Sequence, residues 1–128
     1  MTQEKSIQTR VGVWIDHREA VIVVVTDTGE DIRLIKGLYE PQAAPADDIH
    51  DRAFMGHLNI YYDEVIAGIR DAEAIVILGP GEAKGELTKR IERDNRSGQI
   101  IGMETADKMT HRQIAATVRR YFQDHNGR

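Results

Sequence analysis

The sequence predicts one α/β domain whose sheet has five strands of mixed direction, in the element order β-β-β-α-β-α-β-α. Three observations predict this class: short β-branched runs near the N-terminus, one fully apolar run in the middle, and three amphipathic stretches with apolar residues every three or four positions. The length of 128 residues fits a single domain with one core. We expect residues 1–10, which are mostly polar, to be a flexible N-terminal segment.

The first third of the chain is typical of a three-strand meander. Residues 11–15 and 20–25 are apolar and β-branched, and the polar turn at residues 16–19 joins them, as in an antiparallel hairpin. Thr28 and Gly29 supply a second turn. Residues 31–35 then alternate polar with apolar, so we expect a half-exposed third strand.

The next segment predicts a long loop followed by a helix. Residues 37–56 contain two glycines, two prolines and several acidic residues without periodicity, and loops of this length tend to be functional. Apolar residues then recur at helical spacing between about residues 57 and 71, and this stripe predicts a core-facing helix. The stripe comprises Leu58, Tyr61, Tyr62, Val65, Ile66 and Ile69. The two tyrosines are a candidate base-stacking pair, but their place on the stripe favours a core position for at least one.

The remaining elements alternate strand and helix. Residues 74–78 are apolar throughout, as expected for the central strand of a sheet covered on both faces. A helix follows whose buried stripe is Ala83, Leu87 and Ile91, and on it Glu86 and Arg90 are spaced to pair. Residues 99–103 predict the fifth strand.

The last helix carries the clearest start signal. Thr110 followed by Gln113 is a capping box, in which each side chain bonds the backbone N–H of the other residue. The predicted buried stripe of this helix comprises Ile114, Ala115, Val118 and Phe122.

The composition excludes several classes of protein. The chain has no cysteine, so disulfides, thiolate zinc sites and a cysteine nucleophile are excluded. No apolar run approaches the length of a membrane span, and residues 1–10 lack the apolar core of a signal peptide. We therefore expect a cytoplasmic protein with no membrane partner.

Charge is distributed unevenly along the chain. Residues 1–79 carry a net charge of −7 and residues 80–128 a net charge of +3. If the protein binds RNA, the C-terminal half must supply the phosphate contacts, because phosphate binding requires Lys and Arg; the alternative is a solvated surface of mixed charge. The candidates are Gly79, Gly81, Lys84, Lys89, Arg90, Arg93, Arg112 and Arg119.

The glycine turn after the apolar strand is the most informative segment. Residues 79–85 place a Gly-Pro-Gly turn at a helix N-terminus, where backbone N–H groups attract anions. The spacing matches neither a P-loop nor a dinucleotide fingerprint, and Glu82 opposes phosphate binding. The turn is either a phosphate contact or a structural end to a buried strand.

Two alternative functions remain open. Asp16, Glu104 and Asp107 follow strand ends, and if they gather at one sheet edge they would hold Mg²⁺ in a nuclease or phosphoesterase site; each also has an ordinary turn or loop role. The acidic loop of residues 40–51 is a candidate protein-interaction surface. Its His and Asp residues match no metal-binding spacing, and we expect no metal and no cofactor.

Two motifs resemble a known family. The sequence Gly-Pro-Gly-Glu-Ala-Lys at residues 79–84, and Glu-Thr-Ala-Asp-Lys at residues 104–108 before the last helix, are similar to the middle domain of archaeal and eukaryotic peptide-chain release factors and of Pelota, including stand-alone bacterial relatives. The resemblance extends from about residue 11 to residue 122. It implies a ribonuclease H-like topology and association with translation.

The resemblance does not extend to the catalytic motif of release factors. Those proteins carry Gly-Gly-Gln on the loop before the first helix, whereas here Gln42 stands between Pro41 and Ala43. Pelota-like members also lack the tripeptide and act in ribosome rescue. The sequence therefore predicts a non-catalytic, translation-associated binding module that contacts ribosomal RNA or tRNA.

Overall fold

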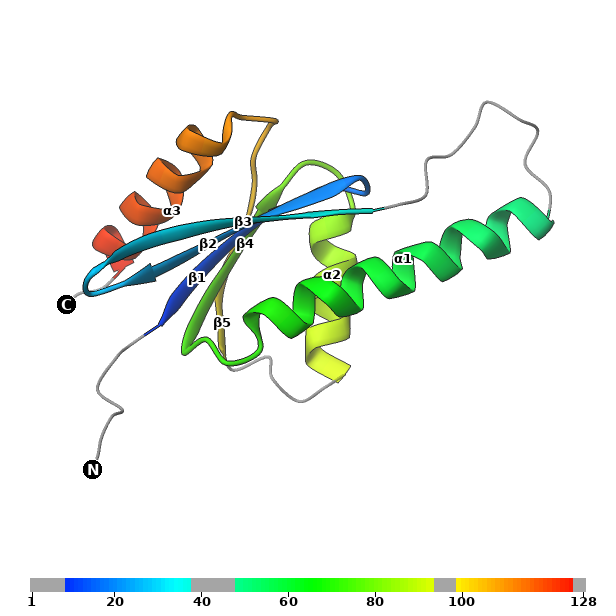
Figure 1. The fold of residues 1–128 in the computed structure, drawn as a ribbon, viewed down its shortest axis with the longest axis horizontal. Coiled ribbons are helices and arrows are strands. Elements are labelled where there is room, and N and C mark those ends of the chain that lie inside the picture. Colours follow the sequence, from blue (N-terminus) through cyan, green and yellow to red (C-terminus); the bar gives the residue numbers. More distant parts are fainter. Residues whose placement is uncertain (1–8, 38–47, 94–98, 126–128) are drawn as a thin grey trace.

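The element order predicted from the sequence is confirmed by a computed structural model, which describes residues 9–37, 48–93 and 99–125. The described residues form five strands and three helices in the order β-β-β-α-β-α-β-α (Figure 1). Their bounds are β1 Arg10–Ile15, β2 Glu19–Thr26, β3 Gly29–Lys36, α1 Asp48–Ile69, β4 Ala74–Gly79, α2 Ala83–Arg93, β5 Ile100–Thr105 and α3 His111–His125. Arg10 of the predicted flexible segment already belongs to β1, and residues 1–8 lie outside the described part.

The sheet is mixed, as predicted, with the strand order β3-β2-β1-β4-β5. β1, β2 and β3 form the antiparallel meander, while β1 pairs parallel with β4 and β4 pairs parallel with β5. The central strand is therefore β1 rather than the apolar run at residues 74–78. That run is covered on both faces as expected, but β5 is the only strand beyond it among the described residues.

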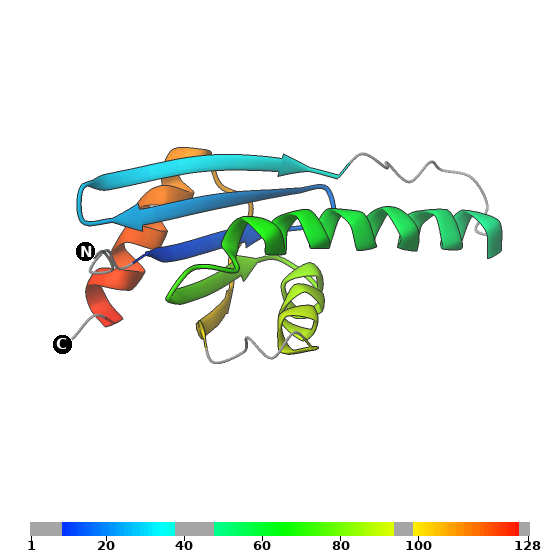
Figure 2. The ribbon, with the colours of Figure 1, turned by 60° about the horizontal axis from the view of Figure 1, so that its bottom comes forward.

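The helices cover the two faces of the sheet unequally. α1 and α2 lie on one face and α3 lies on the other (Figures 1 and 2). Side chains alternate between the faces along each strand, so Val13 packs toward α1 and α2 while Trp14 packs toward α3. All the residues of the three predicted helical stripes are buried, so the periodicity identified the core side of each helix correctly.

Helix α1 begins earlier than predicted. It extends over Asp48–Ile69, so residues 48–56 of the predicted loop 37–56 are helical. Glycine is less favourable than Ala within a helix by about 1 kcal/mol. Gly56 therefore favoured a loop in the sequence analysis, at a position where the helix continues. Residues 38–47 lie outside the described part of the chain.

The two edges of the sheet differ. β5 is shifted by one or two residues from the predicted 99–103, and its pairing with β4 has a register shift between Ile75 and Val76. β3 keeps a regular register with β2 over its eight residues.

Across the described residues, no helix combines the length and the apolar character that a membrane span requires.

Candidate functional site

The turn between β4 and α2 depends on its glycines. Gly79 has a φ of 147°, and a Cβ there would overlap the carbonyl oxygen of Ile15 on the neighbouring strand. Gly81 has a φ of 65°, which is left-handed and favours glycine. The Gly79 carbonyl accepts a hydrogen bond from the Ala106 N–H at 3.1 Å. The structural role of this turn is thus supported, and phosphate binding by its N–H groups stays a prediction.

Two open grooves border this turn. The first has a volume of about 350 Å³ and lies between α2 and β5, and the second, of about 340 Å³, lies beside the β1–β2 turn. The first is lined by Gly81, Glu82, Lys84, Gly85, Glu86, Lys89 and Met103, and the second by Asp16, His17, Pro80, Gly81, Glu82 and Ala83. Both grooves therefore include carboxylates, and only the first includes lysines.

The basic residues of α2 differ in their exposure and in the contacts that they make within the fold. Lys89 and Arg93 are exposed, on the side opposite the buried stripe. Lys84 is half-buried, and its Nζ donates to the Gly81 carbonyl at 2.6 Å. The Arg90 guanidinium lies 4.9 Å from the centroid of the Tyr62 ring and donates to the Asn59 side chain. Arg90 thus joins α2 to α1, and Lys89 and Arg93 are the more accessible pair.

A polar cluster from three elements lies between the β1–β2 turn, α1 and α2. The Tyr62 hydroxyl donates to Glu86 Oε1 at 2.5 Å, and His17 Nε2 lies 3.1 Å from the same oxygen. Glu86 therefore contacts α1 and the turn instead of forming the predicted pair with Arg90. The sequence analysis missed this cluster because its members are 24 and 69 positions apart and share no motif.

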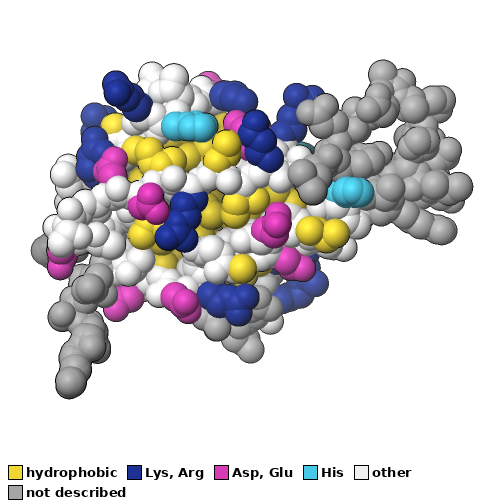
Figure 3. Space-filling view, viewed as in Figure 1, with side chains coloured by type: hydrophobic (Ala, Val, Ile, Leu, Met, Phe, Trp, Pro, Cys, Tyr) yellow, Lys and Arg dark blue, Asp and Glu magenta, His cyan; other side chains and the backbone are white. Residues whose placement is uncertain are grey.

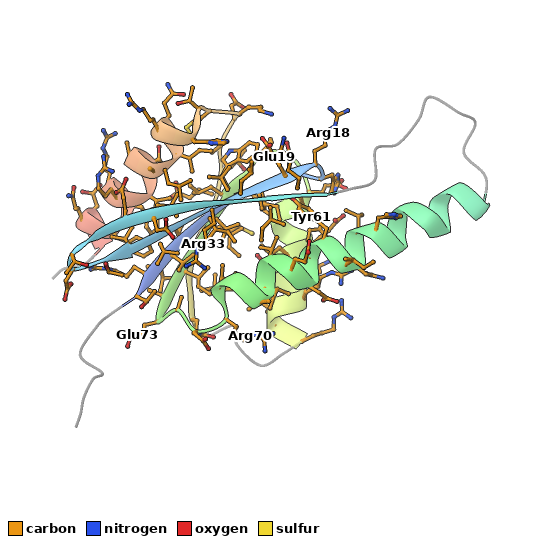
Figure 4. The ribbon with its side chains drawn as sticks, in the orientation of Figure 1. Arg18, Glu19, Arg33, Tyr61, Arg70 and Glu73 are labelled. Atoms are coloured by element: carbon orange, nitrogen blue, oxygen red, sulfur yellow. The ribbon has the colours of Figure 1, made fainter. Side chains whose placement is uncertain are left out.

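Both tyrosines of α1 are core residues. Tyr61 is buried and its hydroxyl donates to the Asp16 carbonyl at 2.8 Å; Figure 4 shows it on the side of α1 that faces the sheet. Burial, with the nearby Asp16, raises the pKa of Tyr61, and burial together with the hydrogen bond to Glu86 raises the pKa of Tyr62. The core interpretation is confirmed for both, and neither ring is available to stack on a base.

The basic residues predicted on α3 lie apart from those on α2. Arg112 is exposed, whereas Arg119 Nη1 donates to both carboxylate oxygens of Glu30 at 2.6 and 2.8 Å. Because α2 and α3 cover opposite faces of the sheet, the six predicted basic residues do not form one surface. Figure 3 likewise shows Lys and Arg interspersed with Asp and Glu on the face in view, without a continuous basic patch.

Of the three residues of the nuclease alternative, Asp16 has a carboxylate that shapes a turn, Asp107 contributes its backbone carbonyl, and Glu104 is exposed. Asp16 Oδ1 accepts the N–H groups of Arg18 and Glu19 at 2.8 and 2.9 Å, which shapes the hairpin turn. The Asp107 carbonyl accepts the Trp14 indole N–H at 3.1 Å, and Glu104 is exposed on β5. Within residues 9–37, 48–93 and 99–125, no three His, Asp or Glu side chains lie close enough to hold a metal. The side chains of residues 40–51, the alternative protein-interaction surface, are outside the described part.

Comparison with known structures shows a shared fold. The Pelota protein of Thermoplasma acidophilum is 17% identical over 94% of this chain and 34% of that chain, with a TM-score of 0.62. An archaeal translation termination factor is 11% identical over 92% of this chain and 40% of that chain, with a TM-score of 0.56. Archaeoglobus fulgidus Pelota is 18% identical over 91% of this chain and 32% of that chain, with a TM-score of 0.53.

These likenesses confirm the predicted resemblance at the level of the fold. The present chain spans only about a third to two-fifths of the length of these structures. Comparison with protein-family models and with curated protein sequences gave no match.

Proposed function

We propose that this chain is a non-catalytic, translation-associated module of the cytosol that contacts ribosomal RNA or tRNA through the outer side of α2. The proposal is supported by a fold shared, over more than nine-tenths of the chain, with Pelota and a translation termination factor. Fold likeness alone does not define activity, so the site must supply the rest of the argument.

The observation that carries the site is the placement of Lys89 and Arg93. Both side chains are exposed on α2, and the buried stripe on the other side of the helix holds α2 against the sheet. Their charges are therefore not needed for packing. Lys84 adds a third charge at the rim of the groove between α2 and β5. Flexible ammonium and guanidinium groups of this kind bind phosphates without reading sequence.

The non-catalytic part of the proposal rests on two candidate sets of catalytic groups, the release-factor tripeptide and the three acidic residues. The sequence contains no Gly-Gly-Gln, the tripeptide that release factors carry on the loop before the first helix. Among the described residues, Asp16, Glu104 and Asp107 do not gather into a group that could hold a metal. We therefore propose binding rather than peptide release or metal-assisted hydrolysis.

A salt series of RNA binding tests the proposal. Binding of tRNA and of a ribosomal RNA fragment is measured for the native chain and for a Lys84→Ala, Lys89→Ala, Arg93→Ala variant. If all three residues contact phosphates, the slope of log K against log salt flattens by about 2 to 3 units, because each contact contributes roughly 0.7 to 0.9.

A charge-matched control separates α2 from the rest of the surface. Lys36→Ala, Arg112→Ala and Arg120→Ala together remove three exposed charges from β3 and α3. We expect this control to keep the native slope. Flattening in the control alone would move the RNA site to the α3 side, and equal slopes in all three proteins would show that the outer side of α2 is only solvated.

A further inference from the structure

The outer edge of β3 is an unpaired sheet edge. β3 is the last strand of the sheet, and no other strand of the described residues pairs with its outer side. Its register with β2 is regular over all eight residues from Gly29 to Lys36. The opposite edge, β5, is interrupted by a register shift, and such irregularities hinder pairing with another strand. β3 is thus the edge that is better suited to accept a further strand.

The side chains of β3 give each face of this edge a distinct character. Ile32 and Leu34 are 40% and 42% exposed, and their partners on β2 belong to the core cluster under α3. Arg33 and Asp31 lie on the other face, toward α1, and pair with each other at 3.1 Å while remaining exposed. Figure 4 shows Arg33 on the side of β3 that faces α1, and Figure 3 shows apolar side chains along this region.

The order of charges along β3 is self-complementary. Asp31 stands directly before Ile32 and Arg33 directly after it, while Glu30 is already paired with Arg119 of the same chain. When such a strand pairs antiparallel with a copy of itself about Ile32, Asp31 of each strand meets Arg33 of the other. A second copy matches this order of charges by symmetry, whereas an unrelated peptide would match it only by coincidence of sequence.

We propose that β3 pairs antiparallel with β3 of a second copy of this chain, about a twofold axis at Ile32. In this register Ile32 lies opposite the partner's Ile32, and Asp31 lies opposite the partner's Arg33. Directly opposed residues of antiparallel strands have Cβ atoms about 4.5–5.5 Å apart, so apolar and opposite-charge pairs both stabilise the contact. The two five-stranded sheets would join into one continuous sheet.

The neighbouring symmetric register is less favourable. A twofold axis at Arg33 would place Arg33 opposite the partner's Arg33, and like charges that are directly opposed destabilise a sheet. The axis at Ile32 exchanges the exposed pair within each strand for two pairs between the strands. This self-association is independent of the proposed RNA contact, because β3 and α2 are separate surfaces of the fold.

A pair of charge variants tests the interface. Light scattering after size-exclusion chromatography is expected to give twice the monomer mass for the native chain. Arg33→Glu places two acidic residues opposite each other, Asp31→Lys places two basic residues opposite each other, and each variant alone should run as a monomer. An equimolar mixture of the two should return to twice the monomer mass. In the mixed pair the introduced lysine of one variant meets the introduced glutamate of the other, and the unchanged Arg33 meets the unchanged Asp31.

Two further variants control for misfolding and for contacts made by the opposite edge of the sheet. The double variant Asp31→Lys, Arg33→Glu restores complementarity within one chain and should again have twice the monomer mass, which excludes misfolding as the cause of dissociation. Met103→Lys alters an exposed residue on β5 and should leave the mass unchanged. A native chain that is monomeric at every concentration, single variants that remain dimeric, or a mixture that stays monomeric would each overturn the proposal, as would dissociation by Met103→Lys.

Discussion

At the scale of the residue, hydrogen bonds of two tyrosine hydroxyls connect α1 to α2 and to the β1–β2 turn. Tyr61 and Tyr62 bury their rings, and each hydroxyl has an acceptor, the Asp16 carbonyl for one and the Glu86 carboxylate for the other. Buried phenols normally require such partners. Helical spacing predicted a core position for at least one of the rings, but the partners of the hydroxyls lie on other elements, so local sequence patterns carry no signal for them.

The raised pKa values of these tyrosines predict a loss of stability at alkaline pH. The folded state holds both phenol protons at a pH where the unfolded chain, with a pKa of about 10, releases them. The contribution is present in full below pH 10, and stability then falls as pH rises, by up to about 1.4 kcal/mol per pH unit for each tyrosine. Denaturant unfolding between pH 9 and 11 measures this slope.

The matched control for that experiment is the double variant Tyr61→Phe, Tyr62→Phe. It keeps the rings and removes both titrating groups, so it should lose about 1 kcal/mol per hydrogen bond at neutral pH. Above pH 10 its slope should be shallower than that of the native chain. Parallel slopes in the two proteins would contradict the assignment.

Gly79 provides a second prediction at the scale of one residue. Gly79→Ala combines a positive φ with an overlap against the Ile15 carbonyl, so we expect a loss of more than about 2 kcal/mol in the free energy of unfolding. Gly85→Ala is the control, because it is helical and a Cβ there meets open space; it should stabilise by about 0.5–1 kcal/mol. Equal melting temperatures for the two variants would refute this account of the turn.

At the scale of elements, the features that depend on residues close together in the sequence were predicted, and those that depend on distant segments were not. The two hairpin turns, the three buried stripes and the capping box arise from neighbours within about four residues, and all were predicted. The first nine residues of α1 were missed, because Gly56 and the mixture of polar and apolar residues before it show no clear helical pattern. The central place of β1 was also missed, since strand order depends on pairing between distant segments.

The capping box of α3 is a quantitative test at this scale. Thr110 Oγ1 accepts the Gln113 N–H at 3.1 Å, and Gln113 Oε1 accepts the Thr110 N–H at 2.9 Å. Thr110→Ala should therefore cost about 1 kcal/mol of stability. Because the two bonds are reciprocal, the double variant Thr110→Ala, Gln113→Ala should lose less stability than the sum of the losses in the two single variants. Additive losses in a double-mutant cycle would show that the two side chains act separately.

At the scale of the molecule, the predicted binding residues divide between two faces. The sequence identified a basic C-terminal half, but the sheet places α2 and α3 on opposite sides, and Arg90 and Arg119 are engaged by Tyr62 and Glu30. Position along the chain therefore identified the basic residues but not their division between the two faces. The fold itself is that of one part of longer translation factors.

The absence of Gly-Gly-Gln from the sequence predicts no peptide-release activity. In the proposed non-catalytic role, no group of this chain orients a water at the peptidyl-tRNA ester. Purified protein added to ribosomes carrying labelled peptidyl-tRNA should release no more label than buffer does, while a release factor added in parallel confirms that the ribosomes are competent. Release in proportion to the protein added would show that another part of the chain performs the chemistry.

Co-sedimentation with ribosomes at two salt concentrations tests the central claim most directly. The native chain should pellet with ribosomes at low salt and be largely released at high salt, because phosphate contacts weaken steeply as counterions are added. The Lys84→Ala, Lys89→Ala, Arg93→Ala variant should pellet less at low salt, and the charge-matched variant of Lys36, Arg112 and Arg120 should behave as the native chain does. A native chain that stays in the supernatant at both salt concentrations would contradict a role in translation through ribosome binding.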